Sequence, residues 1–442
     1  MLLPPYMAAV GLNAFRGPGT WIGDLIEKGV LAGWTSLPIW VGKGIAGVGL
    51  ALWVLPLAAA IVGAQLRSVD QGVVETLRLE PLGRWQRGMQ WLRLLRPGLL
   101  QAWLACAVLM CGSAVPLHVA QVNTLAIAVW KVMDQTAVSE RGALWLATWP
   151  FMLISLAVGV SIWRMLRTQP VVSDVVVRVP PRSHGERAAG LLIWACAAFV
   201  PVLIALWSVD SAAALRSFWR VSGVAMRDSG VIALCSGIAI CGLAVWCAWR
   251  GSTTWVRIVT ATMVAAGVFP GMLIGVLMAT ISRGLDVEGT VFAAGWVVLV
   301  HVLRFGWIGC VVGVFLARSE PQSQRDHRLL DGAGSFTGWV KSCVGWQWGG
   351  MVAAGLAGVA MSFCEIEATI FVQPPELESL PRQMLGHLHF SRTSELGAAS
   401  FYVGVVMLGI AAVAGVLATW VVNQIQVSNV PVTKPDQGKS QP

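Results

Sequence analysis

The stretch SELGA at residues 394–398 opens a long apolar run, and the stretch SERGA at residues 139–143 opens another apolar run 255 residues earlier. The residues before these stretches recur in the same order, because TL at 124–125 is followed 255 residues later by SL at 379–380. Matches that repeat in order along a chain indicate duplication of one structural unit, and transport pathways in membranes are often built from two such units. The sequence therefore predicts a tandem repeat of one membrane module.

The composition indicates an all-α protein that crosses a membrane several times. Hydrophobic residues make up 56% of the 442 residues, charged residues make up 12%, and the mean hydropathy is +0.70. Several runs approach the roughly 20 apolar residues that a membrane-spanning helix needs, and they lack the alternation of a barrel strand. We predict membrane helices at 44–64, 98–117, 144–163, 189–208, 229–249, 258–279, 290–317, 349–372 and 397–422, with an incomplete one at 2–15.

Lysine and arginine are more frequent in the loops on one side of these helices than on the other. The positive-inside rule places that side, which includes the loop at 65–97, in the cytoplasm. The net charge of +9 is then explained by contact with anionic lipids of the bilayer, and nucleic acid is not an expected partner.

The same reading divides the chain into four parts. We predict a first transmembrane module at 1–165, a cytoplasmic linker at 166–187, a second transmembrane module at 188–423 and a disordered cytoplasmic tail at 424–442. The second module holds six predicted helices, whereas the first holds three and the piece at 2–15. We therefore expect the first copy to lack its N-terminal helices.

Each half contains a polar loop of about 30 residues, at 68–97 and at 318–349, between its antepenultimate and penultimate helices. These loops resemble the EAA loop of binding-protein-dependent ABC transporter permeases, in which Glu-Ala-Ala is followed after three residues by Gly. The resemblance implies that a short helix, a turn and a second helix bind a separate ATPase. The residues that it assigns to coupling are Glu75, Thr76, Leu77, Gly83, Trp85, Asp326, Asp331, Gly332, Ala333 and Phe336.

Both loops depart from the family pattern. Thr76 and Leu77 stand in place of its two alanines in the first loop, and His327 and Arg328 in the second. Pro81 takes the place of the glycine in the first loop.

A second resemblance lies in CEIEATIFVQPP at 364–375, followed by ELGAA at 395–399. These stretches are similar to the late segment of iron(III)-type permeases, in which two six-helix modules are fused. That family implies a multi-pass protein of the bacterial inner membrane that works with an ATP-binding subunit, as a dimer, and with a periplasmic solute-binding protein. The implied solute is ferric iron, with thiamine or a polyamine as alternatives. A degenerate paralogue or scaffold that does not transport is the alternative function.

Charged side chains within the predicted helices mark a translocation path. Arg304 lies inside the helix at 290–317, and Glu365 and Glu367 lie toward the outer end of the helix at 349–372. Charges at this depth are unfavourable in lipid and usually face protein or water. They either line the path, form a structural pair of Arg304 with one glutamate, or lie near enough to the interface for their charged ends to reach it.

The sequence carries no motif for catalysis or for a cofactor. It has no phosphate-binding loop, nucleophile elbow or His-Glu-x-x-His motif, so we expect no enzymatic activity and an external source of energy. The nine cysteines form no Cys-x-x-Cys pair, and His387 and His389 lack further ligands nearby, so we expect no metal site.

Overall fold

The computed structural model describes residues 20–67, 71–112, 124–135, 148–168, 211–251, 253–285, 291–320, 335–390 and 392–428, together with scattered positions between these ranges. Within these residues the chain is helical and contains no strand. The helices are α2 (Trp21–Leu31), α3 (Leu37–Arg67), α4 (Gln71–Leu79), α5 (Arg84–Gly112), α7 (Leu125–Gln135), α9 (Trp149–Thr168), α11 (Ala212–Arg250), α12 (Thr254–Val268), α13 (Gly271–Gly284), α14 (Val291–Arg318), α16 (Phe336–Phe363), α17 (Thr369–Val372), α18 (Leu380–His389) and α19 (Thr393–Ser428).

Four of the described helices are long and apolar enough to cross a membrane. They are the spans Leu37–Leu55, Ala212–Arg250, Phe292–Arg318 and Ser394–Leu417. The pair α12 and α13 counts as a fifth span if the two bent pieces are taken together. The protein is therefore an all-α membrane protein with several spans, as the composition predicted.

The prediction of one continuous helix at 258–279 is wrong. α12 ends at Val268, α13 begins at Gly271, and the two helices are bent by 107°. Pro270 is the N-cap of α13. Proline has no backbone N–H and its ring clashes with the preceding turn, so the helix breaks at this position.

Other boundaries also differ from the predicted ones. The helix predicted at 98–117 begins at Arg84, so that it includes part of the predicted loop, and the helix predicted at 349–372 begins at Phe336 and ends at Phe363. Arginine and glutamine in the first turns of α5, and Lys341 and Ser342 in the second turn of α16, lower the hydropathy at these starts. α19 continues to Ser428 and α9 to Thr168, beyond the predicted edges of the tail and the linker. The predicted helix at 2–15, most of that at 189–208 and most of the linker lie outside the described residues.

Glycines let the central helices α11, α14 and α16 approach closely. A Cβ atom at Gly309 or Gly313 of α14 would overlap the Ile240 or Ala244 carbonyl oxygen of α11. A Cβ atom at Gly355 of α16 would lie 3.1 Å from the Gly237 carbonyl oxygen of α11. Small residues at such crossings allow backbone contact, which replaces the hydrophobic driving force that is missing in lipid.

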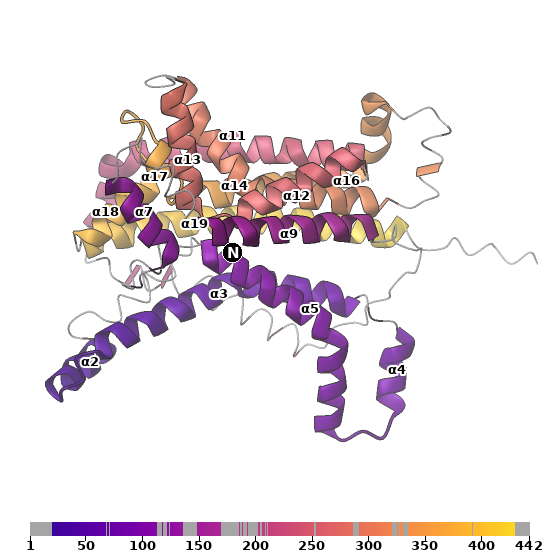
Figure 1. The fold of residues 1–442 in the computed structure, drawn as a ribbon, viewed down its shortest axis with the longest axis horizontal. Coiled ribbons are helices and arrows are strands. Elements are labelled where there is room, and N and C mark those ends of the chain that lie inside the picture. The colour runs from indigo at the N-terminus through magenta and orange to yellow at the C-terminus, as the bar shows by residue number, and fades with distance from the viewer. Residues whose placement is uncertain are drawn as a thin grey trace, which may run out of the picture.

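The two halves of the chain meet where α9 packs on α12 (Figure 1). A Cβ atom at Gly159 of α9 would lie 3.2 Å from the Ala261 carbonyl oxygen of α12, and Arg318 of α14 donates to the Leu166 carbonyl oxygen of α9 at 2.6 Å. α3 and α5 pack on each other below this body in Figure 1, and α4 with the first turns of α5 projects from it.

Candidate functional site

Arg304 lies in the middle of α14 and forms ion pairs with both glutamates of the turn that follows α16. Its Nε atom is 3.1 Å from Glu365 Oε2, and its Nη2 atom donates to Glu367 Oε2 at 2.6 Å. The Arg304 side chain is 14% exposed and each glutamate side chain is 5% exposed. We refer to these three residues as the Arg304 cluster.

The turn at 364–368, between α16 and α17, is fixed by hydrogen bonds around Glu365. The Ala368 N–H donates to Glu365 Oε1 at 2.8 Å, and the Thr369 hydroxyl donates to the Glu365 carbonyl oxygen at 3.1 Å. His301, one turn before Arg304 on α14, shares a 2.8 Å hydrogen bond between its Nε2 atom and Thr369 Oγ1. Non-helical backbone inside a membrane protein needs such internal partners.

Two glycines of α13 form the surface on which this cluster lies. The Arg304 guanidinium lies directly over Gly271, where a Cβ atom would overlap it, and a Cβ atom at Gly275 would lie 2.6 Å from the Ala368 carbonyl oxygen. Gly271 and Gly275 are one helical turn apart and face the same neighbours. The break before α13 therefore places these glycines under Arg304 and the turn.

The structure thus brings together the three residues that the sequence assigned to a translocation path. Arg304 contacts both glutamates, whereas the sequence considered a pair with one. Ionisable side chains at such buried positions are unfavourable in lipid, and within membrane spans they are candidates for a functional site. The described residues contain no group of three or more His, Cys, Asp or Glu side chains that could hold a metal ion.

The described residues of the first loop segment (68–97) form a helix–turn–helix. α4 carries Glu75, Thr76 and Leu77, and residues 80–83 turn the chain into α5. The Gln86 side chain accepts a hydrogen bond of 3.2 Å from the Gly83 N–H, which is half of a capping box at the start of α5.

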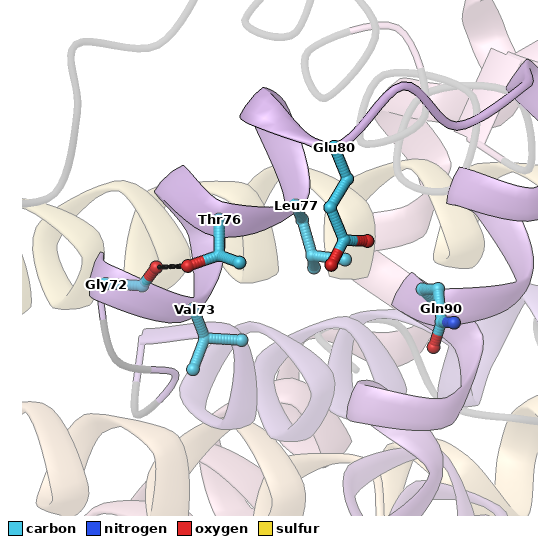
Figure 2. Close-up of a pocket in the computed structure, with 6 residues that line it drawn as sticks. All are labelled: Gly72, Val73, Thr76, Leu77, Glu80 and Gln90. Atoms are coloured by element: carbon cyan, nitrogen blue, oxygen red, sulfur yellow. Dashed lines mark hydrogen bonds between the residues drawn. The ribbon is translucent and has the colours of Figure 1, made fainter.

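An open groove of about 480 Å³ lies between the two arms of this segment. Figure 2 shows Thr76 donating to the Gly72 carbonyl oxygen at 2.7 Å, with the Glu80 and Gln90 side chains at the opposite end of the groove. Val73 and Leu77 supply its apolar wall. The groove has polar ends and an apolar middle.

In the second loop segment, residues 318–349, an ion pair joins Arg328 to Glu320, and Glu320 also contacts Cys343 of α16. Arg328 donates to both carboxylate oxygens of Glu320 at 2.9 Å, and the Cys343 thiol donates to Glu320 Oε1 at 3.5 Å. The hydrogen bond from Arg328 to this carboxylate raises the pKa of Arg328. A bidentate pair of this kind fixes geometry better than a single contact does.

Exposed apolar side chains occupy matching places in the two loop segments. Leu79 at the end of α4 is 85% exposed, and Leu330 in the second segment is 82% exposed. Trp85 in the first turn of α5 is 80% exposed, and Phe336, which opens α16, is 46% exposed. The interval from Leu79 to Leu330 along the chain equals that from Trp85 to Phe336. Phe336 is less exposed because it packs edge-on against Trp249 of α11.

The remaining residues assigned to coupling are scattered over these segments. Glu75, Thr76, Gly83 and Asp326 are exposed, and Leu77 is buried. Asp331, Gly332 and Ala333 lie outside the described residues, as does the stretch at 139–143 that opened the repeat.

Sequence reasoning missed His301 and Thr369 at the cluster, and Leu79 and Leu330 on the loop segments. The three-residue spacing of His301 and Arg304 puts both on one helix face, and it could have indicated that His301 lies near the cluster.

No family model, curated protein or solved structure matches this chain.

Proposed function

We propose that the chain is the membrane-spanning permease subunit of an ABC importer, and that a separate ATP-binding subunit binds its two loop segments. The observation that carries this proposal is the matched pair of exposed apolar residues, Leu79 with Trp85 and Leu330 with Phe336. Aromatic side chains are enriched in protein interfaces, so we expect Trp85 and Phe336 to be the main contacts of the partner.

The equal spacing of the two pairs indicates what kind of partner binds them. A homodimer presents the same pocket twice. A single chain that carries two copies of one binding surface can therefore fill both pockets. We therefore propose an ATPase dimer that contacts one loop segment with each of its subunits. ATP-driven closure of such a dimer moves the two segments together and transmits the movement to α5 and α16.

Helix boundaries support the tandem repeat on which this arrangement depends. The ends of α3 and α14, at Arg67 and Arg318, are separated by the same interval as Leu79 and Leu330. The starts of α7 and α18, at Leu125 and Leu380, are separated by the interval between the SERGA and SELGA stretches. Equal intervals between elements of similar length are expected of a duplicated module.

The broken pair α12 and α13, with the Arg304 cluster beside it, supports a path through the second half. Transporter binding sites are commonly formed by discontinuous helices, and charges within spans commonly mark the route of a solute. We propose that Arg304, Glu365 and Glu367 line this route. Ferric iron or a similar small solute, delivered by a periplasmic binding protein across the bacterial inner membrane, is the cargo that the family resemblance implies.

Site-specific photo-crosslinking in membranes of the native host tests the proposal. A benzophenone amino acid is placed at Trp85 or at Phe336, and the crosslinked products are identified by mass spectrometry. We expect both positions to capture the same polypeptide, and that polypeptide to contain the phosphate-binding loop Gly-x-x-x-x-Gly-Lys-Ser/Thr.

Trp103 is the matched control, because it is 65% exposed but lies in the apolar half of α5. A benzophenone at this position should not capture the ATPase. The proposal fails if neither loop position captures a protein with a phosphate-binding loop. That result would favour the alternative function, a scaffold that does not transport.

A further inference from the structure

We propose that Arg304 closes the second half of the protein on the side opposite to the loop segments, by holding the turn at 364–368 against α13. The contact must open before a solute can pass. That the contact opens during transport rests on the proposed function. That Arg304 holds the turn closed can be tested on this chain alone.

The chain path places the cluster far from the loop segments. α16 begins at the second loop segment, with Phe336, and ends at Phe363, directly before the turn. In Figure 1, α13, α17 and α18 lie together at one end of the body, and α4 lies toward the other. A contact at this end therefore controls access from the side that the ATPase does not occupy.

Both partners of the contact are joined to the rest of the bundle at points where a helix is interrupted. α13 is separated from α12 by the 107° bend at Pro270, and the turn at 364–368 separates α17 from α16. Interruptions of this kind absorb backbone rotation while the long helices stay intact. α13 and the turn can therefore separate without disturbing the packing of α11 on α14.

Arg304 supplies the charged contacts of the turn beside α13, whereas apolar packing and the close approach of Gly275 to Ala368 supply the others. Arg304 binds Glu365 and Glu367 at the two positions that flank Ile366, a side chain that is 4% exposed. The glycine at 271 gives the guanidinium its place on α13. Removing Arg304 takes its positive charge away from two buried carboxylates, which favours their movement into water.

The corresponding helix of the first half, α3, carries apolar residues at the matching positions. When the two halves are aligned by the interval between Leu79 and Leu330, Trp53 corresponds to Arg304 and Leu50 to His301. Both Trp53 and Leu50 are buried. The proposed closing contact therefore belongs to the second half, although the loop segments are matched.

Thiol labelling of the purified chain in detergent tests this proposal without any partner protein. Ile366 is replaced by cysteine in a chain whose native cysteines are replaced except Cys343, which is 2% exposed and lies near the second loop segment. The probe is a water-soluble maleimide. We expect Arg304→Gln to raise the labelling rate at position 366 by about tenfold or more, through local opening, and to leave the rate at Cys343 unchanged.

Two further variants keep the test decisive. Arg283→Gln removes an exposed arginine at the other end of α13 and should leave both rates unchanged. If Arg304→Gln does not fold, Glu367→Gln removes one ion pair and keeps the other, and we expect about a threefold increase or more at position 366. An unchanged labelling rate at position 366 in the folded variant overturns the proposal. An equal increase in the rate at Cys343 also overturns it, because it would indicate partial unfolding of the whole protein. Neither result bears on the photo-crosslinks to the ATPase.

Discussion

At the scale of single residues, Gly271 has the clearest physical role in the site. The Arg304 guanidinium occupies the space above its Cα atom, and no larger residue fits there without moving Arg304 away from Glu365 and Glu367. The glycine matters for close approach, since its backbone is ordinary helix. The ion pairs in turn make the position sensitive, because buried charges that lose a partner are strongly unfavourable.

We predict that Gly271→Ala lowers the stability of the detergent-solubilised protein by about 1–3 kcal/mol, as overpacking does in other cores. Thermal unfolding followed by size-exclusion chromatography measures this change. Gly295→Ala in α14 is the control, because a Cβ atom there meets nothing within 4 Å. It should be neutral or slightly stabilising, since alanine favours helix by about 1 kcal/mol. Equal effects of the two substitutions would contradict the assignment.

At the scale of elements, the packing of α14 on α11 depends on backbone contact. Gly309 and Gly313 are one turn apart and each lies against a carbonyl oxygen of α11, which cannot rotate away as a side chain can. Steric overlap at such a position separates the two helices along their whole crossing.

We therefore predict that Gly309→Ala destabilises the protein by about 1–3 kcal/mol. Gly242→Ala, on α11 but with no atom within 4 Å of the added Cβ, is the matched control and should not destabilise. Midpoints of thermal unfolding in the same detergent provide the comparison. A Gly309→Ala protein as stable as the control would mean that α11 and α14 are further apart than described.

The second loop segment gives a separate prediction about local order. Glu320 and Arg328 fix the chain between α14 and α16, so Arg328→Gln should release it. We expect chymotrypsin to cut after the exposed Leu330 several times faster in this variant, as local unfolding becomes more frequent. Lys341→Gln, at an exposed position of α16, should leave the rate of cutting unchanged. Equal rates in all three proteins would show that the ion pair does not order the segment.

At the scale of the whole molecule, the chain path puts the start of α16 and the turn at 364–368 at opposite ends of a long helix, and we expect these ends to face opposite sides of the membrane. The distribution of lysine and arginine predicts which of these sides is cytoplasmic. The membrane class of the protein rests on four to five apolar helices among the described residues. These statements together predict which positions a reagent outside the cell can reach.

We predict that a cysteine in place of Gly83, in the turn of the first loop segment, reacts with a membrane-impermeant maleimide only in inside-out vesicles. A cysteine in place of the exposed Glu376, between α17 and α18, should react only in right-side-out vesicles. The native cysteines are replaced in both proteins. Reaction of both positions from the same side would overturn the assigned topology.

Much of the fold was predictable because long apolar runs have few alternatives in a membrane. The runs that became α3, α11, α14 and α19 were found, although the start of α11 was wrong: it begins at Ala212 and not at 229, because its first turns carry several charged residues. The break at Pro270 was missed, since both sides of it are equally apolar and hydropathy alone does not register it. α7 and α18 were missed because helices of 11 and 10 residues are too short for a membrane-length window.

The sequence by itself determined that this protein is helical, that it lies in a membrane and that Arg304, Glu365 and Glu367 are exceptional, because lipid excludes unpaired charge and unpaired backbone. Only the tertiary structure decided that Arg304 binds both glutamates and lies over Gly271, a residue of a separate helix. The contacts join α13, α14 and the turn after α16. Such contacts depend on how helices cross and bend, and no local pattern of residues encodes them.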